Sequence, residues 1–113
     1  MVAEETRRVI RATVLYPTKP GSRFDAEYYL KTHMPLAERL VGSAIKGVTV
    51  DIGISGGAPG EPAPFAAITT MTFESVDAFS QAFLPHVQAL MNDVPNYTDI
   101  EPVLQLSAIG IEK

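Results

Sequence analysis

The order of two hydrophobic periodicities limits the fold of this chain more than any other feature of its sequence. Alternating apolar and polar residues indicate a half-buried strand, and apolar residues every three or four positions indicate an amphipathic helix. The sequence shows the first pattern four times and the second twice, in the order strand, helix, strand, strand, helix, strand. The predicted strands span about Arg8 to Tyr16, Ile45 to Ile54, Phe65 to Phe73 and Val103 to Ile111, and the predicted helices are Ala26 to Val41 and one that begins after Ser75.

Capping and turn residues mark the ends of these elements. Asp25 and Ser75 stand where a helix N-cap accepts backbone N–H groups, and Gly42 is a suitable helix terminator. The segment from Ser55 to Pro64 contains three glycines and three prolines, which is typical of an exposed hairpin loop between two strands.

This order of elements predicts a ferredoxin-like α+β fold. In the split βαββαβ unit, two helices cover one face of a four-stranded antiparallel sheet. A length of 113 residues suits one hydrophobic core. We therefore expect a single domain over residues 1–113, with its core at about 8–111.

Composition and charge exclude several classes of function. The net charge is −4, and the one positive cluster, Arg7 and Arg8 with Arg11, is expected at the frayed start of the first strand, so nucleic-acid binding has no electrostatic support. The absence of cysteine excludes disulfides, thiolate metal sites and cysteine nucleophiles. Neither a secretory signal nor an apolar stretch long enough to span a membrane is present, which predicts a cytoplasmic protein without a membrane partner.

The second face of the sheet predicts a homodimer. Two helices leave this face uncovered, and we expect it to carry Val9, Leu15, Ile68 and a Leu or Val of the last strand. A second copy related by a two-fold axis would cover both exposed faces at once. The alternative is a solvated sheet face with scattered apolar residues, which is common in antiparallel sheets.

His33 is the candidate catalytic residue. On a helical wheel it lies about 40° from Tyr29, within the apolar arc, so its imidazole should enter the space between helix and sheet. Burial disfavours the charged form and leaves a neutral ring that can give and accept one hydrogen bond, as a proton-shuttling base or a ligand anchor requires. The alternative is a core histidine bonded to a backbone carbonyl or a tyrosine hydroxyl.

Pro35 indicates a kink beside His33, because proline has no N–H to donate to the carbonyl of Lys31. A kink could open the space between helix and sheet into a pocket. The candidate substrate-binding residues are the tyrosines expected to form its amphipathic walls: Tyr16, Tyr28, Tyr29 and Tyr97.

Metal binding is not expected. His86 lies at the edge of its helix's apolar stripe beside Pro85, where a partly exposed surface position is expected. A metal site would need a third ligand, and only Asp51, Asp93 and Asp99 are available. We predict neither a metal nor a cofactor.

Two segments resemble the EthD family. The first is Tyr16-Pro17 followed by Phe24-Asp25-Ala26-Glu27-Tyr28-Tyr29 and His33-Met34-Pro35-Leu36, and the second is Asp93-Val94-Pro95-Asn96-Tyr97. The resemblance extends from about Arg8 to Ile111 and implies a dimeric α+β barrel. The family takes its name from an association with microbial degradation of an alkyl ether alongside an oxygenase system.

The resemblance implies a small enzyme or accessory factor in oxidative degradation of an apolar or aromatic small molecule. His33 would be the acid/base or anchoring residue and the tyrosines would orient the substrate, in oxidoreductase-associated or cofactor-free acid–base chemistry. The alternative is a non-catalytic protein that binds a hydrophobic small molecule. A third interpretation is haem binding through His33.

Overall fold

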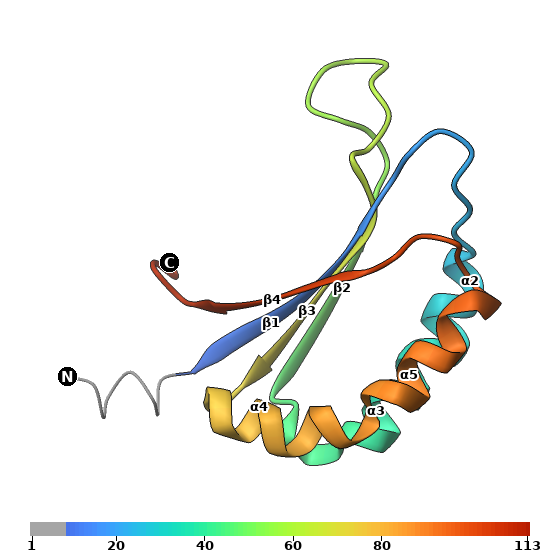
Figure 1. The fold of residues 1–113 in the computed structure, drawn as a ribbon. Helices are drawn as coiled ribbons and strands as arrows, with labels where there is room; N and C mark the ends of the chain where they lie inside the picture. Colours follow the sequence, from blue (N-terminus) through green and yellow to red (C-terminus); the bar gives the residue numbers. More distant parts are fainter. Residues whose placement is uncertain (1–8) are drawn as a thin grey trace.

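The computed structural model describes residues 9–113, and a four-stranded antiparallel sheet forms its centre. The sheet has the strand order β2-β3-β1-β4, with β1 paired to both β3 and β4 (Figure 1). Arg7 and Arg8, the expected frayed start of the first strand, lie outside the described residues. The strands are β1 (Ile10–Pro17), β2 (Gly47–Ile52), β3 (Phe65–Phe73) and β4 (Val103–Ala108).

Two interrupted helices cover one face of this sheet (Figure 1). The first consists of α2 (Ala26–Tyr28), a π-helical turn (Tyr29–His33) and α3 (Met34–Val41), and a 3-10 turn over Gly42–Ala44 follows it. The second consists of α4 (Val76–Phe83), a 3-10 turn (Leu84–His86) and α5 (Val87–Asp93), and a 3-10 turn over Val94–Asn96 ends it.

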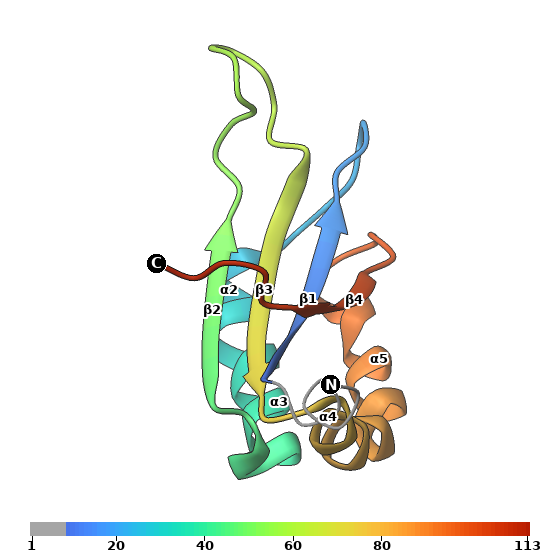
Figure 2. The same cartoon turned by 90° about the vertical axis from the view of Figure 1, so that its left-hand side faces the viewer.

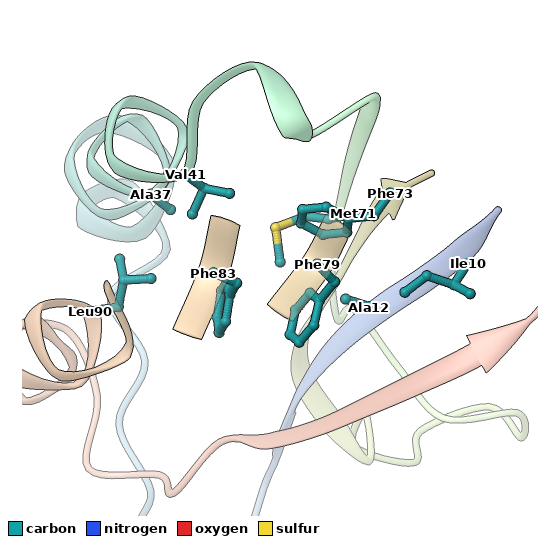
Figure 3. Close-up of a cluster of buried hydrophobic side chains, with 9 residues drawn as sticks. All are labelled: Ile10, Ala12, Ala37, Val41, Met71, Phe73, Phe79, Phe83 and Leu90. Atoms are coloured by element: carbon teal, nitrogen blue, oxygen red, sulfur yellow. The ribbon is translucent and has the colours of Figure 1, made fainter. Parts of the chain in front are cut away.

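The predicted caps position both helices. The Asp25 carboxylate accepts a hydrogen bond from the Tyr28 N–H, and the Ser75 hydroxyl accepts one from the Ala78 N–H. The main core lies between the helices and the sheet (Figure 3). These observations confirm the ferredoxin-like α+β fold. The core side chains are Ile10, Ala12, Ala37, Val41, Met71, Phe73, Phe79, Phe83 and Leu90.

The expected kink at Pro35 takes the form of a π-helical turn. The N–H of Met34 bonds to the carbonyl of Tyr29, five residues back, which adds one residue to the turn before Pro35. Because of this extra residue, Met34 lies above Tyr29 rather than above Leu30. The side chain of Leu30 points outward and is 45% exposed.

The two outer strands are shorter than predicted. Strand β2 begins at Gly47 rather than at Ile45, whose N–H closes the 3-10 turn by bonding to the Gly42 carbonyl. At its other end the strand stops at Ile52, so Ile54 lies beyond it and is exposed. Strand β4 ends at Ala108 instead of Ile111. The chain then crosses the sheet face that the helices leave open (Figure 2), where Arg11 forms an ion pair with Glu112.

This open face is more polar than predicted. Val103, which pairs with Leu15, is the apolar residue that β4 contributes to this face, whereas Leu104 and Leu106 pair with β1 residues on the helix face. Leu15 and Ile68 are half-buried there. Polar residues of the same strand faces surround them: Thr13, Thr49, Thr70, Thr72, Gln105 and Ser107.

Gly53 provides a test of the β2–β3 hairpin. A Cβ atom at Gly53 would lie 2.2 Å from the carbonyl oxygen of Phe65, whereas a Cβ at Gly57 would meet nothing within 4 Å. We expect Gly53→Ala to lower the free energy of unfolding by about 1–3 kcal/mol, because the backbones must separate to admit the methyl group. Gly57→Ala should leave it within about 0.5 kcal/mol. Urea unfolding measures both, and equal values for the two variants would contradict the close approach.

Candidate functional site

His33 ends the π-helical turn and is buried, with 6% of its surface exposed. Its ring stacks on Tyr29, with ring centres 5.4 Å apart, and contacts Tyr97, with ring centres 4.6 Å apart. The Nδ1 atom lies 2.9 Å from Oδ2 of Asp93, the last residue of α5. This hydrogen bond joins the middle of the first helix to the end of α5.

Asp93 is held as a carboxylate by several donors. Burial raises its pKa, but hydrogen bonds from Asn96, His33 and Tyr28 outweigh this effect, and the pKa lies below its ordinary value. The Tyr28 hydroxyl donates to Oδ1 at 2.8 Å and the Asn96 amide donates to the same oxygen at 2.9 Å. Asp93 therefore remains a hydrogen-bond acceptor for the imidazole.

This arrangement determines which nitrogen of His33 is available. A carboxylate accepts hydrogen bonds, so Nδ1 carries a proton and Nε2 of the neutral ring carries the lone pair. Nε2 makes no hydrogen bond within residues 9–113, where every fully buried side-chain nitrogen or oxygen has a partner. Nε2 therefore retains access to open space.

A cavity of about 70 Å³ lies beside His33, between the helices and the sheet. His33, Tyr16, Tyr29 and Thr69 contribute its polar groups. The remaining lining is apolar and comes from both helices, β1, β3 and the segment before β4: Val14, Met34, Ala37, Met71, Phe83, Leu90, Met91, Val94 and Pro102.

The four predicted tyrosines gather around His33 but have different positions. Tyr16 and Tyr29 line the cavity, whereas Tyr97 lies behind them, with its hydroxyl 2.7 Å from that of Tyr16. The Tyr29 hydroxyl lies 2.5 Å from that of Thr69. Tyr28 lies on the far side of Asp93.

All four tyrosine hydroxyls stay protonated at neutral pH. Burial is the main cause of the raised pKa of Tyr16, Tyr29 and Tyr97, and the hydrogen bond to Asp93 is the main cause of the raised pKa of Tyr28. These groups can donate or accept hydrogen bonds, but they are poor proton acceptors.

Sequence reasoning missed the role of Asp93, which it considered only as an available metal ligand. Asn96 and Thr69 were also not identified as site residues. The only signal was the segment Asp93-Val94-Pro95-Asn96-Tyr97, whose resemblance to a family motif was visible but whose contact with His33 was not.

The other histidine lies apart from this site. His86 is half-buried at the end of a 3-10 turn and does not line the cavity. Over residues 9–113, no cluster of three or more His, Asp or Glu side chains is placed to bind a metal ion. Within the same range, no helix has the length and apolar character needed to cross a membrane.

Three solved structures are similar to this fold. An EthD-like protein from Ralstonia eutropha JMP134 has 38% sequence identity and a TM-score of 0.88, over 95% of this chain and 96% of its own. A putative monooxygenase from Shewanella loihica PV-4 has 14% identity and a TM-score of 0.55, over 94% and 97% of the two chains. A dimeric protein with a ferredoxin-like fold from Bacteroides fragilis NCTC 9343 has 15% identity and a TM-score of 0.52, over 89% and 96%.

A search of curated proteins gave no match. The family model described as the EthD domain matches residues 22–101, which include His33, Asp93 and all of the tyrosines around them except Tyr16. This match covers well over half of the chain, and the chain therefore belongs to the EthD family.

Proposed function

We propose that this protein is a small enzyme that removes a proton from an apolar or aromatic small molecule, with His33 as the general base. The observation that carries the proposal is the imidazole that lines an apolar cavity and is held by Asp93 through Nδ1, with Nε2 free of hydrogen bonds within residues 9–113. A base in hydrogen-bond reach of its substrate contributes about 10²- to 10⁴-fold to a rate.

The proposed step balances within the site. The substrate's C–H or O–H bond breaks, its proton moves to Nε2, and the electron pair remains on the substrate as an anion. The negative charge of Asp93 stabilises the imidazolium that forms. Tyr16 and Tyr29 offer protonated hydroxyls at the cavity wall that can orient an oxygen of the substrate.

Tyr28 and Tyr97 have a positioning role in this scheme. Tyr28 hydrogen-bonds to Asp93, and Tyr97 packs against the imidazole, so both restrict the orientation of the pair. The cavity of about 70 Å³ suits a molecule well below drug size. It does not favour the haem interpretation, because a porphyrin is far larger than this space.

The family and the shared fold support placing this step in oxidative degradation. The resemblance to the EthD family implies an association with alkyl ether degradation, and the Shewanella protein with the same fold is described as a putative monooxygenase. We infer that the chain acts on a molecule that an oxygenase system consumes or produces. The alternative is a protein that binds such a molecule without changing it.

Proton exchange at carbon tests the proposed base directly. In D₂O, proton nuclear magnetic resonance would follow the loss of α-hydrogen signals from a panel of small ketones, from acetone to 2-indanone. We expect His33→Gln to slow protein-catalysed exchange at least about 100-fold, because glutamine cannot accept the proton. His86→Gln is the matched control and should retain the wild-type rate.

Two outcomes contradict the proposed base: exchange that is equal in wild type and His33→Gln, or no exchange of any ketone in the panel. Saturation-transfer measurements on the same samples detect binding independently. Binding without exchange, weakened only in affinity by His33→Gln, would favour the binding protein. Circular dichroism verifies that each variant folds.

The lowered pKa of Asp93 predicts how the pair contributes to stability. Its folded-state pKa lies below the unfolded value of about 3.9, so the contribution is fully present above about pH 5 and is lost as pH falls through the folded pKa. At pH 7 we expect the free energy of unfolding of Asp93→Asn to be about 1–3 kcal/mol lower than that of wild type.

The difference between wild type and Asp93→Asn should shrink when urea unfolding is repeated at about pH 3, because the unfolded wild type binds a proton at Asp93 there and the folded state approaches its lowered pKa. Glu101→Gln, which changes an exposed carboxylate before β4, should have little effect at either pH. A difference that stays constant from pH 7 to pH 3 would argue against a stabilising carboxylate at Asp93.

We also propose that the chain forms a homodimer through its open sheet face. Leu15, Ile68 and Val103 give this face an apolar component, and the Bacteroides protein with the same fold is described as dimeric. Threonine hydroxyls around these residues can hydrogen-bond across a two-fold axis.

Light scattering after size exclusion measures the assembly. At a protein concentration of about 10 µM we expect a molar mass twice the 12.2 kDa of one chain, because specific interfaces commonly have dissociation constants below this concentration. Ile68→Lys should give a monomer because it places a charge on the interface, whereas Leu30→Lys, on the helix side of the molecule, should remain dimeric. A wild-type monomer would contradict the dimer.

A further inference from the structure

A surface groove of about 430 Å³ adjoins the cavity beside His33. It lies over the end of α5 and the segment that leads into β4. Met91, Val94 and Pro102 line both the groove and the cavity, so these three side chains form the wall between them. The groove's other lining residues are Arg23, Pro95, Thr98, Asp99, Ile100 and Glu101.

Of the three shared residues, Met91 is the one that can move without disturbing the fold. Val94 is 8% exposed and branched at Cβ, and Pro102 has a closed ring, so neither can rotate away easily. Met91 is 43% exposed and has an unbranched, flexible side chain. Rotation of this side chain toward solvent exposes little additional buried surface.

We propose that Met91 is the gate residue that determines which molecules reach Nε2 of His33. The Met91 side chain lies in the wall between the cavity of about 70 Å³ and the groove, and its rotation widens the passage between the two spaces. The apolar part of a ligand then enters toward His33, and a polar part remains in the groove beside Arg23, Asp99 and Glu101.

This gate selects for slender apolar molecules with one polar end. The inner cavity admits a small apolar group only, while the groove offers both signs of charge and open solvent. Asp99 accepts a hydrogen bond from the backbone of Arg23, and the Arg23 guanidinium donates to the Pro95 carbonyl, so the groove's floor is held in place. The inference rests on the proposed function only in taking His33 as the group to be reached.

Chemical modification of the imidazole tests the gate without a substrate. Diethyl pyrocarbonate transfers an ethoxycarbonyl group to an unprotonated imidazole nitrogen, and peptide mass spectrometry gives separate rates for His33 and His86. We expect Met91→Ala to raise the His33 rate at least about threefold, because a shorter side chain leaves the route open, and Met91→Trp to lower it to a similar degree. His86, which lines neither space, should keep its rate.

Leu30→Ala is the matched control, since it truncates another exposed apolar side chain that lines neither space. It should leave both rates unchanged. Equal His33 modification rates in wild type, Met91→Ala and Met91→Trp would overturn the gate. A rise in the modification rates of both histidines in Met91→Ala would also overturn it, because it indicates that the whole fold has loosened. Because this readout is access to Nε2, the gate can be confirmed even when no ketone exchanges its protons.

Discussion

The hydrogen bond between His33 and Asp93 is the contact on which the candidate site depends. It joins the π-helical turn within the first helix to the last residue of α5. The extra residue of the π-helical turn aligns Met34 with Tyr29, and both Tyr29 and His33 are buried. An uninterrupted α-helix would align Met34 with Leu30 instead.

The site combines a fixed polar layer with an apolar cavity. Asp93 receives three hydrogen bonds and in turn orients the imidazole, while the tyrosine and threonine hydroxyls pair with one another. Nε2 of His33 makes no hydrogen bond within residues 9–113. An arrangement of this kind leaves the lone pair of Nε2 available to a ligand, and each hydroxyl pair shares one hydrogen bond and has a second proton left to donate.

The fold could be predicted from the sequence because periodicity and caps are local signals. The alternation that defines Phe65–Phe73 and the capping roles of Asp25 and Ser75 need no knowledge of distant residues. The buried position of His33 followed from the same periodicity. The pairing of His33 with Asp93 could not be predicted, because 60 residues separate them and a helical wheel gives a face but not a partner.

Neighbouring tyrosines show the same limit of sequence reasoning. Tyr28 and Tyr29 differ by one position, and the turn between them sends one hydroxyl to Asp93 and the other into the cavity. Both were predicted to contact a substrate. Only the three-dimensional arrangement distinguishes Tyr28, which supports Asp93, from Tyr29, which lines the cavity. Strand ends were also difficult, because β4 stops where its pairing with β1 stops, and no residue in the sequence marks that point.

The segment after β4 has a consequence for assembly. It crosses the open sheet face and is held to β1 by the ion pair between Arg11 and Glu112. A second copy approaching that face meets the segment after β4 first, and must either displace this segment or enclose it between the two sheets. Since an ion pair at the surface contributes little stability, displacement is inexpensive. The last few residues of the chain can therefore set how readily two copies associate without contacting the imidazole at all.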